Sequence, residues 1–136
     1  MTEIELPALL PVRQRLWSKR VANLEAEVEG LVRRSRLAAR IKPGFTVAVA
    51  AGSRGVANID RIVASVTATV RALGGQPFVV PAMGSHGGGT AEGQREVLES
   101  YGITEAFTGV PIRASMEVIQ SLSRCLRALP TKSNIA

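Results

Sequence analysis

The residues best suited to chemistry lie in the glycine-rich segment 81–90 (PAMGSHGGGT), which holds the one histidine of the sequence, His86. Glycine carries no side chain, so a ligand can approach both the imidazole and the backbone N–H groups. An imidazole exchanges protons near neutral pH and serves as a general acid or base. The candidate anion-binding groups around it are Gly84, Ser85, Gly87 and Gly88. This segment therefore predicts acid–base chemistry on an anionic small molecule.

A second candidate group is Ser53-Arg54 in the short segment 52–55 (GSRG). Arginine offers a permanent charge and a planar fork that suits a carboxylate or phosphate, and serine offers a hydroxyl donor. The chain contains neither the Gly-x-Gly-x-x-Gly pattern of dinucleotide-binding folds nor the P-loop pattern. The two segments thus indicate an anion site without a standard nucleotide fingerprint.

The elements that must position these groups are two short apolar strands. Strands are expected at 46–51 and 76–81, with a helix near 58–73 between them, capped by Asn58 and ended by Gly74-Gly75. Such a strand–helix–strand unit makes the two strands parallel, and both loops then leave the same end of the sheet. If the strands are neighbours, Arg54 and His86 face one ligand.

The remaining pattern predicts a partial Rossmann-like α/β fold, a three-layer parallel sheet. Further helices are expected near 19–40 and 90–101, and a third strand near 110–118, which Pro111 weakens. The predicted domain spans 19–120, preceded by an N-terminal arm (1–18) and followed by an irregular tail (121–136).

Composition indicates a folded protein whose partner is not nucleic acid. The chain has 136 residues, 46% of them hydrophobic, which excludes an intrinsically disordered protein. The net charge of +6 gathers at the ends, with +4 in residues 1–42, −1 in 43–120 and +3 in 121–136. Aromatic residues make up 4%, so the basic, aromatic-rich face typical of nucleic-acid binding is not predicted.

The apolar stretches, the first ten residues and the cysteine and histidine counts bear on cellular location and metal binding. No apolar stretch is long enough to span a bilayer, and the first ten residues lack the basic start of a signal peptide. We therefore expect a cytoplasmic protein with no membrane partner. One cysteine, Cys125, and one histidine far from it predict neither a disulfide nor a self-contained zinc site.

Simpler interpretations of the same residues stay open. The glycines fit a flexible turn, His86 fits a solvated side chain, and Arg54 fits an ordinary surface cation. The same two loops also fit a non-catalytic α/β module that binds a nucleotide or phosphate. A third interpretation is a basic accessory protein that acts through its termini.

The sequence from 41 to 118 resembles the N-terminal catalytic domain of the nickel-dependent lactate racemase family, and in particular its larger relatives. The resemblance rests on the segments 47–59 (VAVAAGSRGVANI), 81–94 (PAMGSHGGGTAEGQ), 102–105 (GITE) and 115–118 (SMEV). It implies an isomerase that interconverts the enantiomers of a 2-hydroxy acid by passing a hydride to and from a nickel-pincer nucleotide. It also implies that His86 removes the hydroxyl proton and that Arg54 contacts the cofactor and the substrate anion.

The chain departs from the family pattern at several positions. The segment 52–55 lacks the acidic residue and the proline of the family's Asp-x-Thr-Arg-Pro motif, and no second histidine is present. No position matches the lysine that tethers the cofactor or the histidine that ligates nickel. The resemblance fades after about Gln120, which fits a truncated or frameshifted reading frame. We therefore expect a chain that is inactive alone, with self-association or a missing C-terminal half.

Overall fold

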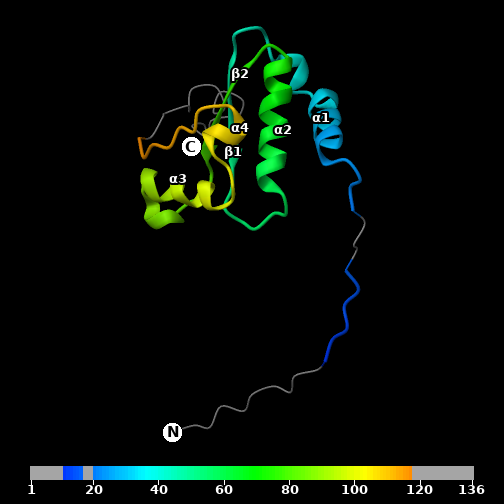
Figure 1. Ribbon diagram of the computed structural model, residues 1–136, viewed down its shortest axis with the longest axis vertical. Helices are drawn as coiled ribbons and strands as arrows, with labels where there is room; N and C mark the ends of the chain where they lie inside the picture. The colour runs from blue at the N-terminus through cyan, green and yellow to red at the C-terminus, as the bar shows by residue number, and fades with distance from the viewer. Residues whose placement is uncertain (1–10, 17–19, 118–136) are drawn as a thin grey trace, which may run out of the picture.

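The computed structural model describes residues 11–16 and 20–117, which form a mixed α/β fold (Figure 1). Its elements in chain order are α1 (Leu24–Arg34), a 3-10 turn (Ala38–Arg40), β1 (Thr46–Ala51), α2 (Ile59–Ala72), β2 (Gln76–Pro81), a second 3-10 turn (Gly87–Gly89), α3 (Ala91–Ser100) and α4 (Glu105–Thr108). None of these helices has the length and apolar character needed to cross a bilayer. The expected tail, most of the expected arm and Cys125 lie outside the described residues.

The sheet consists of β1 and β2, which are neighbours and run parallel. Their register pairs Thr46 with Gln76 at one end and Ala51 with Pro81 at the other. The pairing continues past the strands, because the Ala82 N–H donates to the Ala51 carbonyl at 2.8 Å. Both predicted strands and their adjacency are therefore confirmed, and the loops that follow them start side by side.

The expected third strand at 110–118 is corrected to a single parallel bridge between Val79 and Ile112. The Val79 N–H donates to the Pro111 carbonyl at 2.9 Å, and the Arg113 N–H donates to the Val79 carbonyl at 2.8 Å. Pro111 has no N–H of its own, so the ladder cannot extend toward the start of the segment. Residue 118 lies outside the described part of the chain.

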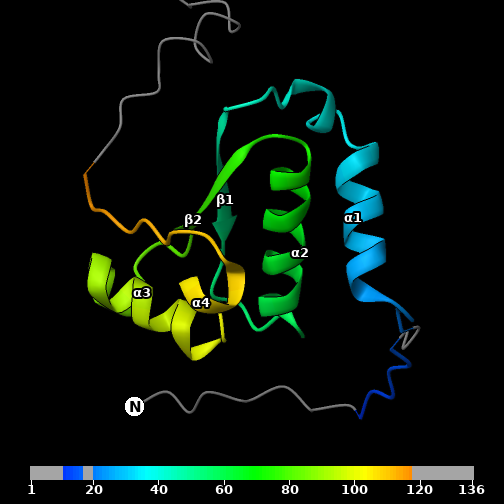
Figure 2. The ribbon, with the colours of Figure 1, turned by 45° about the horizontal axis from the view of Figure 1, so that its top comes forward.

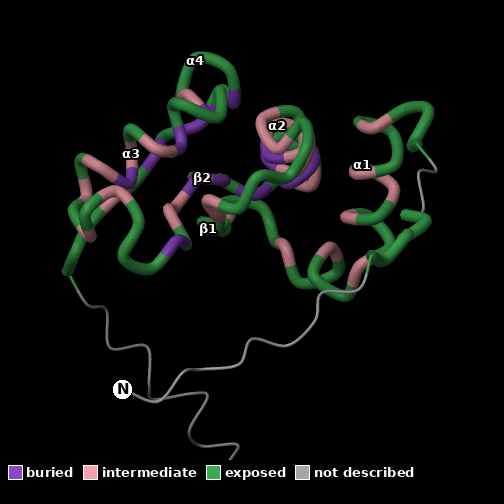
Figure 3. Tube along the Cα trace, turned by 90° about the horizontal axis from the view of Figure 1, so that it is seen from below, coloured by how far each residue is buried: buried purple, intermediate pink, exposed green. Residues whose placement is uncertain are grey.

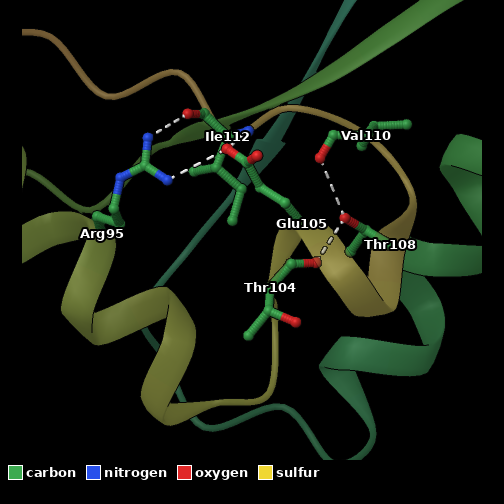
Figure 4. A network of polar contacts seen from close by, with 6 residues as sticks. All are labelled: Arg95, Thr104, Glu105, Thr108, Val110 and Ile112. Atoms are coloured by element: carbon green, nitrogen blue, oxygen red, sulfur yellow. Dashed lines mark hydrogen bonds and ion pairs between the residues drawn. The ribbon is translucent and has the colours of Figure 1, made fainter.

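A clamp of two side chains, Arg95 and Glu105, holds the Ile112 peptide on its outer side (Figure 4). The Ile112 N–H donates to Glu105 Oε1 at 2.9 Å, and Arg95 Nη2 donates to the Ile112 carbonyl at 2.6 Å. Arg95 Nη1 also lies 3.2 Å from Glu105 Oε1. The Ile112 N–H and then Arg95 hold the pKa of Glu105 below its ordinary value. Side chains thus occupy the edge where another strand would pair.

The expected helix at 19–40 is corrected to the shorter α1. Asn23 caps its start, since the Asn23 side chain accepts from the Ala26 N–H at 3.0 Å. The helix ends before Ser35, whose backbone is extended, and only the 3-10 turn follows. Glu29 and Arg33, four residues apart on α1, form an ion pair with 2.7 Å between Arg33 Nε and Glu29 Oε1.

The other two expected helices are confirmed within one residue at each end, with one difference in capping. Thr90 caps α3 by accepting from the Gly93 N–H at 3.1 Å, and Gly74, at φ +90°, follows the last residues of α2. Asn58 precedes α2 in the left-handed conformation and makes no capping hydrogen bond from its side chain. A capping side chain needs an extended backbone, so the predicted cap is wrong.

The described residues form two layers with the core between them (Figure 3). One face of the sheet, carrying Ala51 and Val79, packs against Val63 of α2 and Leu98 of α3. Helix α1 packs on α2 at the periphery and buries no residue of its own (Figure 2). The opposite face presents the residues that alternate with the core positions, namely Ala48, Ala50, Phe78 and Val80, each exposed or half-buried. A third layer is not seen among the described residues.

Candidate functional site

The candidate site is a cavity of about 380 Å³ at the carboxyl ends of β1 and β2. Parallel strands deliver their loops to this end, which is where open α/β sheets bind ligands. The lining residues come from both loops and the start of α2; they are Gly52, Ser53, Arg54, Val56, Ile59, Ala82, Met83 and His86. The structure therefore brings Ser53, Arg54 and His86 to one cavity, and their chemical roles stay predictions.

Ser53 and His86 form the closest polar contact across the two loops. Ser53 Oγ lies 2.5 Å from His86 Nδ1, although 33 residues separate them in the sequence. The Ser53 side chain is half-buried and His86 is exposed. With Nδ1 engaged by the hydroxyl, Nε2 is the ring nitrogen left for a ligand.

Arg54 dominates the electrostatics of the cavity. It carries the one full charge among the lining residues and is exposed to solvent. The start of α2 lies at the same cavity through Ile59, so the positive end of the helix dipole adds to the attraction of an anion. Asp60 in the first turn of α2 offsets part of this attraction. The net field favours one anionic group beside Arg54.

The other predicted site residues do not line this cavity. Gly84 sits in the histidine loop at φ +62°, and its carbonyl accepts from Gln94 Nε2 at 2.7 Å. Ser85 and Gly88 are exposed. Gly87 lines a separate hollow beside the first turns of α3, together with Thr90 and Glu92. The histidine loop is thus divided between two hollows.

The backbone amides of the glycine run serve turns more than an open anion site. The Gly89 N–H donates to the His86 carbonyl at 3.3 Å, and the Thr90 N–H donates to the Gly87 carbonyl at 3.4 Å. Gly87 and Gly93 approach so closely that a Cβ on either would overlap the backbone of the other. The amides of Gly89 and Thr90 are therefore engaged within the loop, whereas the sequence pattern had predicted amides open to a ligand.

Two residues that sequence reasoning did not assign to the site hold its loops. Tyr101, at the end of α3, donates from its hydroxyl to the Ser53 carbonyl at 3.0 Å. Gln94, within α3, donates to the Gly84 carbonyl as described above. Their spacing of seven residues was the available signal, because it puts both on one face of a helix.

Metal-binding side chains do not gather in the described ranges, 11–16 and 20–117, where no group of three or more His, Cys, Asp or Glu residues is suited to hold an ion. Comparisons with protein-family models, curated proteins and solved structures give no match.

Proposed function

We propose that this cavity binds a small 2-hydroxy acid and forms part of a site of the lactate-racemase type, on a portion of a Rossmann-like sheet. The observation that carries the proposal is the 2.5 Å contact between Ser53 Oγ and His86 Nδ1, with Arg54 in the same cavity. These three side chains supply a proton acceptor, a group that orients it and an anion receptor. A 2-hydroxy acid presents the matching hydroxyl and carboxylate.

His86 is the proton acceptor for the substrate hydroxyl. A neutral imidazole accepts at one nitrogen only when the other carries the proton. For Nε2 to accept, Nδ1 must be protonated and must donate to Ser53 Oγ, which the contact allows. The proposal assigns Ser53 Oγ the role of acceptor from Nδ1–H, which holds the tautomer that works as a base.

Arg54 binds the carboxylate. Its guanidinium is the cation at the cavity and offers paired donors in the geometry of a carboxylate. In the proposed pose, the hydroxyl, one carbon from the carboxylate, faces His86 in the same cavity. The cavity volume of about 380 Å³ suits a ligand of a few heavy atoms.

The described residues do not fit the nickel-pincer nucleotide that the resemblance implies. A protein-bound nickel ion needs several ligands, but His86 is the sole histidine of the sequence and no group of three or more metal-binding side chains occurs in the described part of the chain. No hydride-transfer step is assigned to these residues. We expect the chain by itself to bind a 2-hydroxy acid without racemising it.

The test is binding of lactate compared with propionate, which lacks the hydroxyl. If Nε2 of His86 contacts the hydroxyl, lactate binds more tightly by roughly three- to tenfold, the worth of one hydrogen bond. The preference disappears in His86→Ala, while Arg54→Ala weakens both acids by roughly tenfold or more. Arg36→Ala, an exposed arginine outside the cavity, serves as the control. Calorimetry measures the affinities, and equal affinity of the wild-type protein for both acids overturns the proposal.

The alternative function is a nucleotide- or phosphate-binding module without chemistry. It predicts that AMP or inorganic phosphate stabilises the protein against thermal unfolding. That stabilisation would survive His86→Ala and fall in Arg54→Ala. The engaged amides of Gly89 and Thr90 reduce the number of backbone donors that the histidine loop offers a phosphate.

A further inference from the structure

One face of α3 contacts both loops of the site. Gln94 and Tyr101 are seven residues apart, two turns of helix, and so lie on the same side of α3. Gln94 Nε2 donates to the Gly84 carbonyl at 2.7 Å, and the Tyr101 hydroxyl donates to the Ser53 carbonyl at 3.0 Å. The first bond holds the loop of His86, and the second holds the loop of Ser53.

Burial gives this face of α3 a fixed position. Leu98, between Gln94 and Tyr101 on the same face, is fully buried in the core that also includes Val79 of β2. Gln94 is itself 7% exposed, which is unusual for a glutamine and fits a side chain held by its hydrogen bond. Because Leu98 is anchored, the two donors have little freedom to follow a moving loop.

We propose that α3 is a brace and that Gln94 and Tyr101 are positioning residues that set the contact between Ser53 Oγ and His86 Nδ1. Each fixes the backbone of one loop, and the contact depends on both backbones. The inference rests on the proposed function, in which Ser53 Oγ accepts from the protonated Nδ1 of His86. It adds that the geometry of the base is controlled from a helix outside the cavity lining.

The readout is the tautomer of the imidazole, followed by nitrogen NMR of protein without a histidine tag. The chain has one histidine, so every imidazole signal reports His86. At a pH where the ring is neutral, we expect the tautomer with the proton on Nδ1 to dominate in the wild-type protein. Tyr101→Phe and Gln94→Met should each shift the ratio toward the Nε2–H form by roughly three- to tenfold, the worth of one hydrogen bond.

A double-mutant cycle separates positioning from a general loss of stability. In a Ser53→Ala background, Tyr101→Phe should leave the tautomer ratio unchanged, because the contact that it supports is already gone. Ser100→Ala is the matched control, since its hydroxyl bonds to the Val97 carbonyl within α3 and reaches neither loop. Thermal unfolding of each variant confirms that the fold is kept.

Two results overturn the brace. One is an unchanged tautomer ratio in both Tyr101→Phe and Gln94→Met. The other is a shift of equal size with and without Ser53. Neither result depends on lactate, so the brace can fail while acid binding survives, and acid binding can fail while the brace holds.

Discussion

Gly87 is the glycine of the histidine loop at which neighbouring backbone leaves no space for a side chain. Its backbone is left-handed, at φ +63°, and it lies against the backbone of Gly93 in the first turn of α3. Gly88 has a similar φ of +67°, yet a Cβ there would meet open space. The two neighbours therefore separate the cost of the left-handed backbone from the cost of close packing.

We predict that Gly87→Ala lowers the free energy of unfolding by about 3 kcal/mol or more, because strain and overlap add. Gly88→Ala, the matched control, should cost about 1 kcal/mol from the left-handed backbone alone. Urea denaturation measures both values. Equal costs at the two positions would show that the approach to Gly93 is not tight.

The site residues differ in how far their placement could be predicted from sequence. Ser53 and His86 each follow a recognisable strand, so parallel topology was enough to bring them to one end of the sheet. Gln94 and Tyr101 act on backbone carbonyls of loops far away in the chain. Their seven-residue spacing puts both on one face of α3, but the carbonyls that they reach depend on tertiary packing, which the spacing does not predict.

At the scale of elements, the Arg95–Glu105 clamp ties α3 and α4 to the bridge beside β2. Glu105 is the acceptor of both the Ile112 N–H and Arg95, and its carboxyl must be ionised to accept fully from both. Its pKa is lowered in the folded protein, so folding favours the ionised form.

We predict that Glu105→Gln is less stable than the wild type at neutral pH and that the difference shrinks on acidification. A depressed folded-state pKa contributes stability above the unfolded-state pKa of the carboxyl, and this is lost as pH falls through the folded-state value. Thermal unfolding of both proteins across the acidic range measures the difference. Glu99→Gln, at an exposed position of α3, is the control. A difference that does not change with pH would contradict the role of the charge.

The same clamp explains why the third strand was overpredicted. The apolar pattern near 110–118 is typical of a strand, but the Ile112 peptide pairs with side chains on its outer side. The strands at 46–51 and 76–81 have no such competitors, and their predicted bounds match the observed ones. Asn58 is a comparable case, because asparagine suits both a cap and a left-handed turn.

At the scale of the whole molecule, β1 is a free edge of the sheet among the described residues. Its six residues contain no charge and no proline, so it lacks the usual protection against pairing with another chain. The face beside it carries Ala48 and Phe78, and the Arg113 guanidinium stacks over the Phe78 ring at 4.4 Å.

We predict that the protein self-associates and that Ala48→Lys reduces this, since a lysine on an edge strand opposes pairing. Light scattering should report a mass that rises with concentration in the wild type and stays near the monomer in the variant. Ala106→Lys, which adds the same charge at an exposed position of α4, should associate like the wild type. A monomeric wild type at all concentrations would refute the prediction.

The two edges of the sheet differ in whether another strand can pair with them. Beside β2 the Ile112 peptide is already occupied by Arg95 and Glu105, whereas the far side of β1 remains vacant among the described residues. An additional strand, from this chain or another, could therefore extend the sheet only along β1. If that strand lies parallel to β1, the loop that follows it emerges at the same end of the sheet, next to Ser53 and Arg54. The loop would then add a wall to the cavity on the side of these two residues.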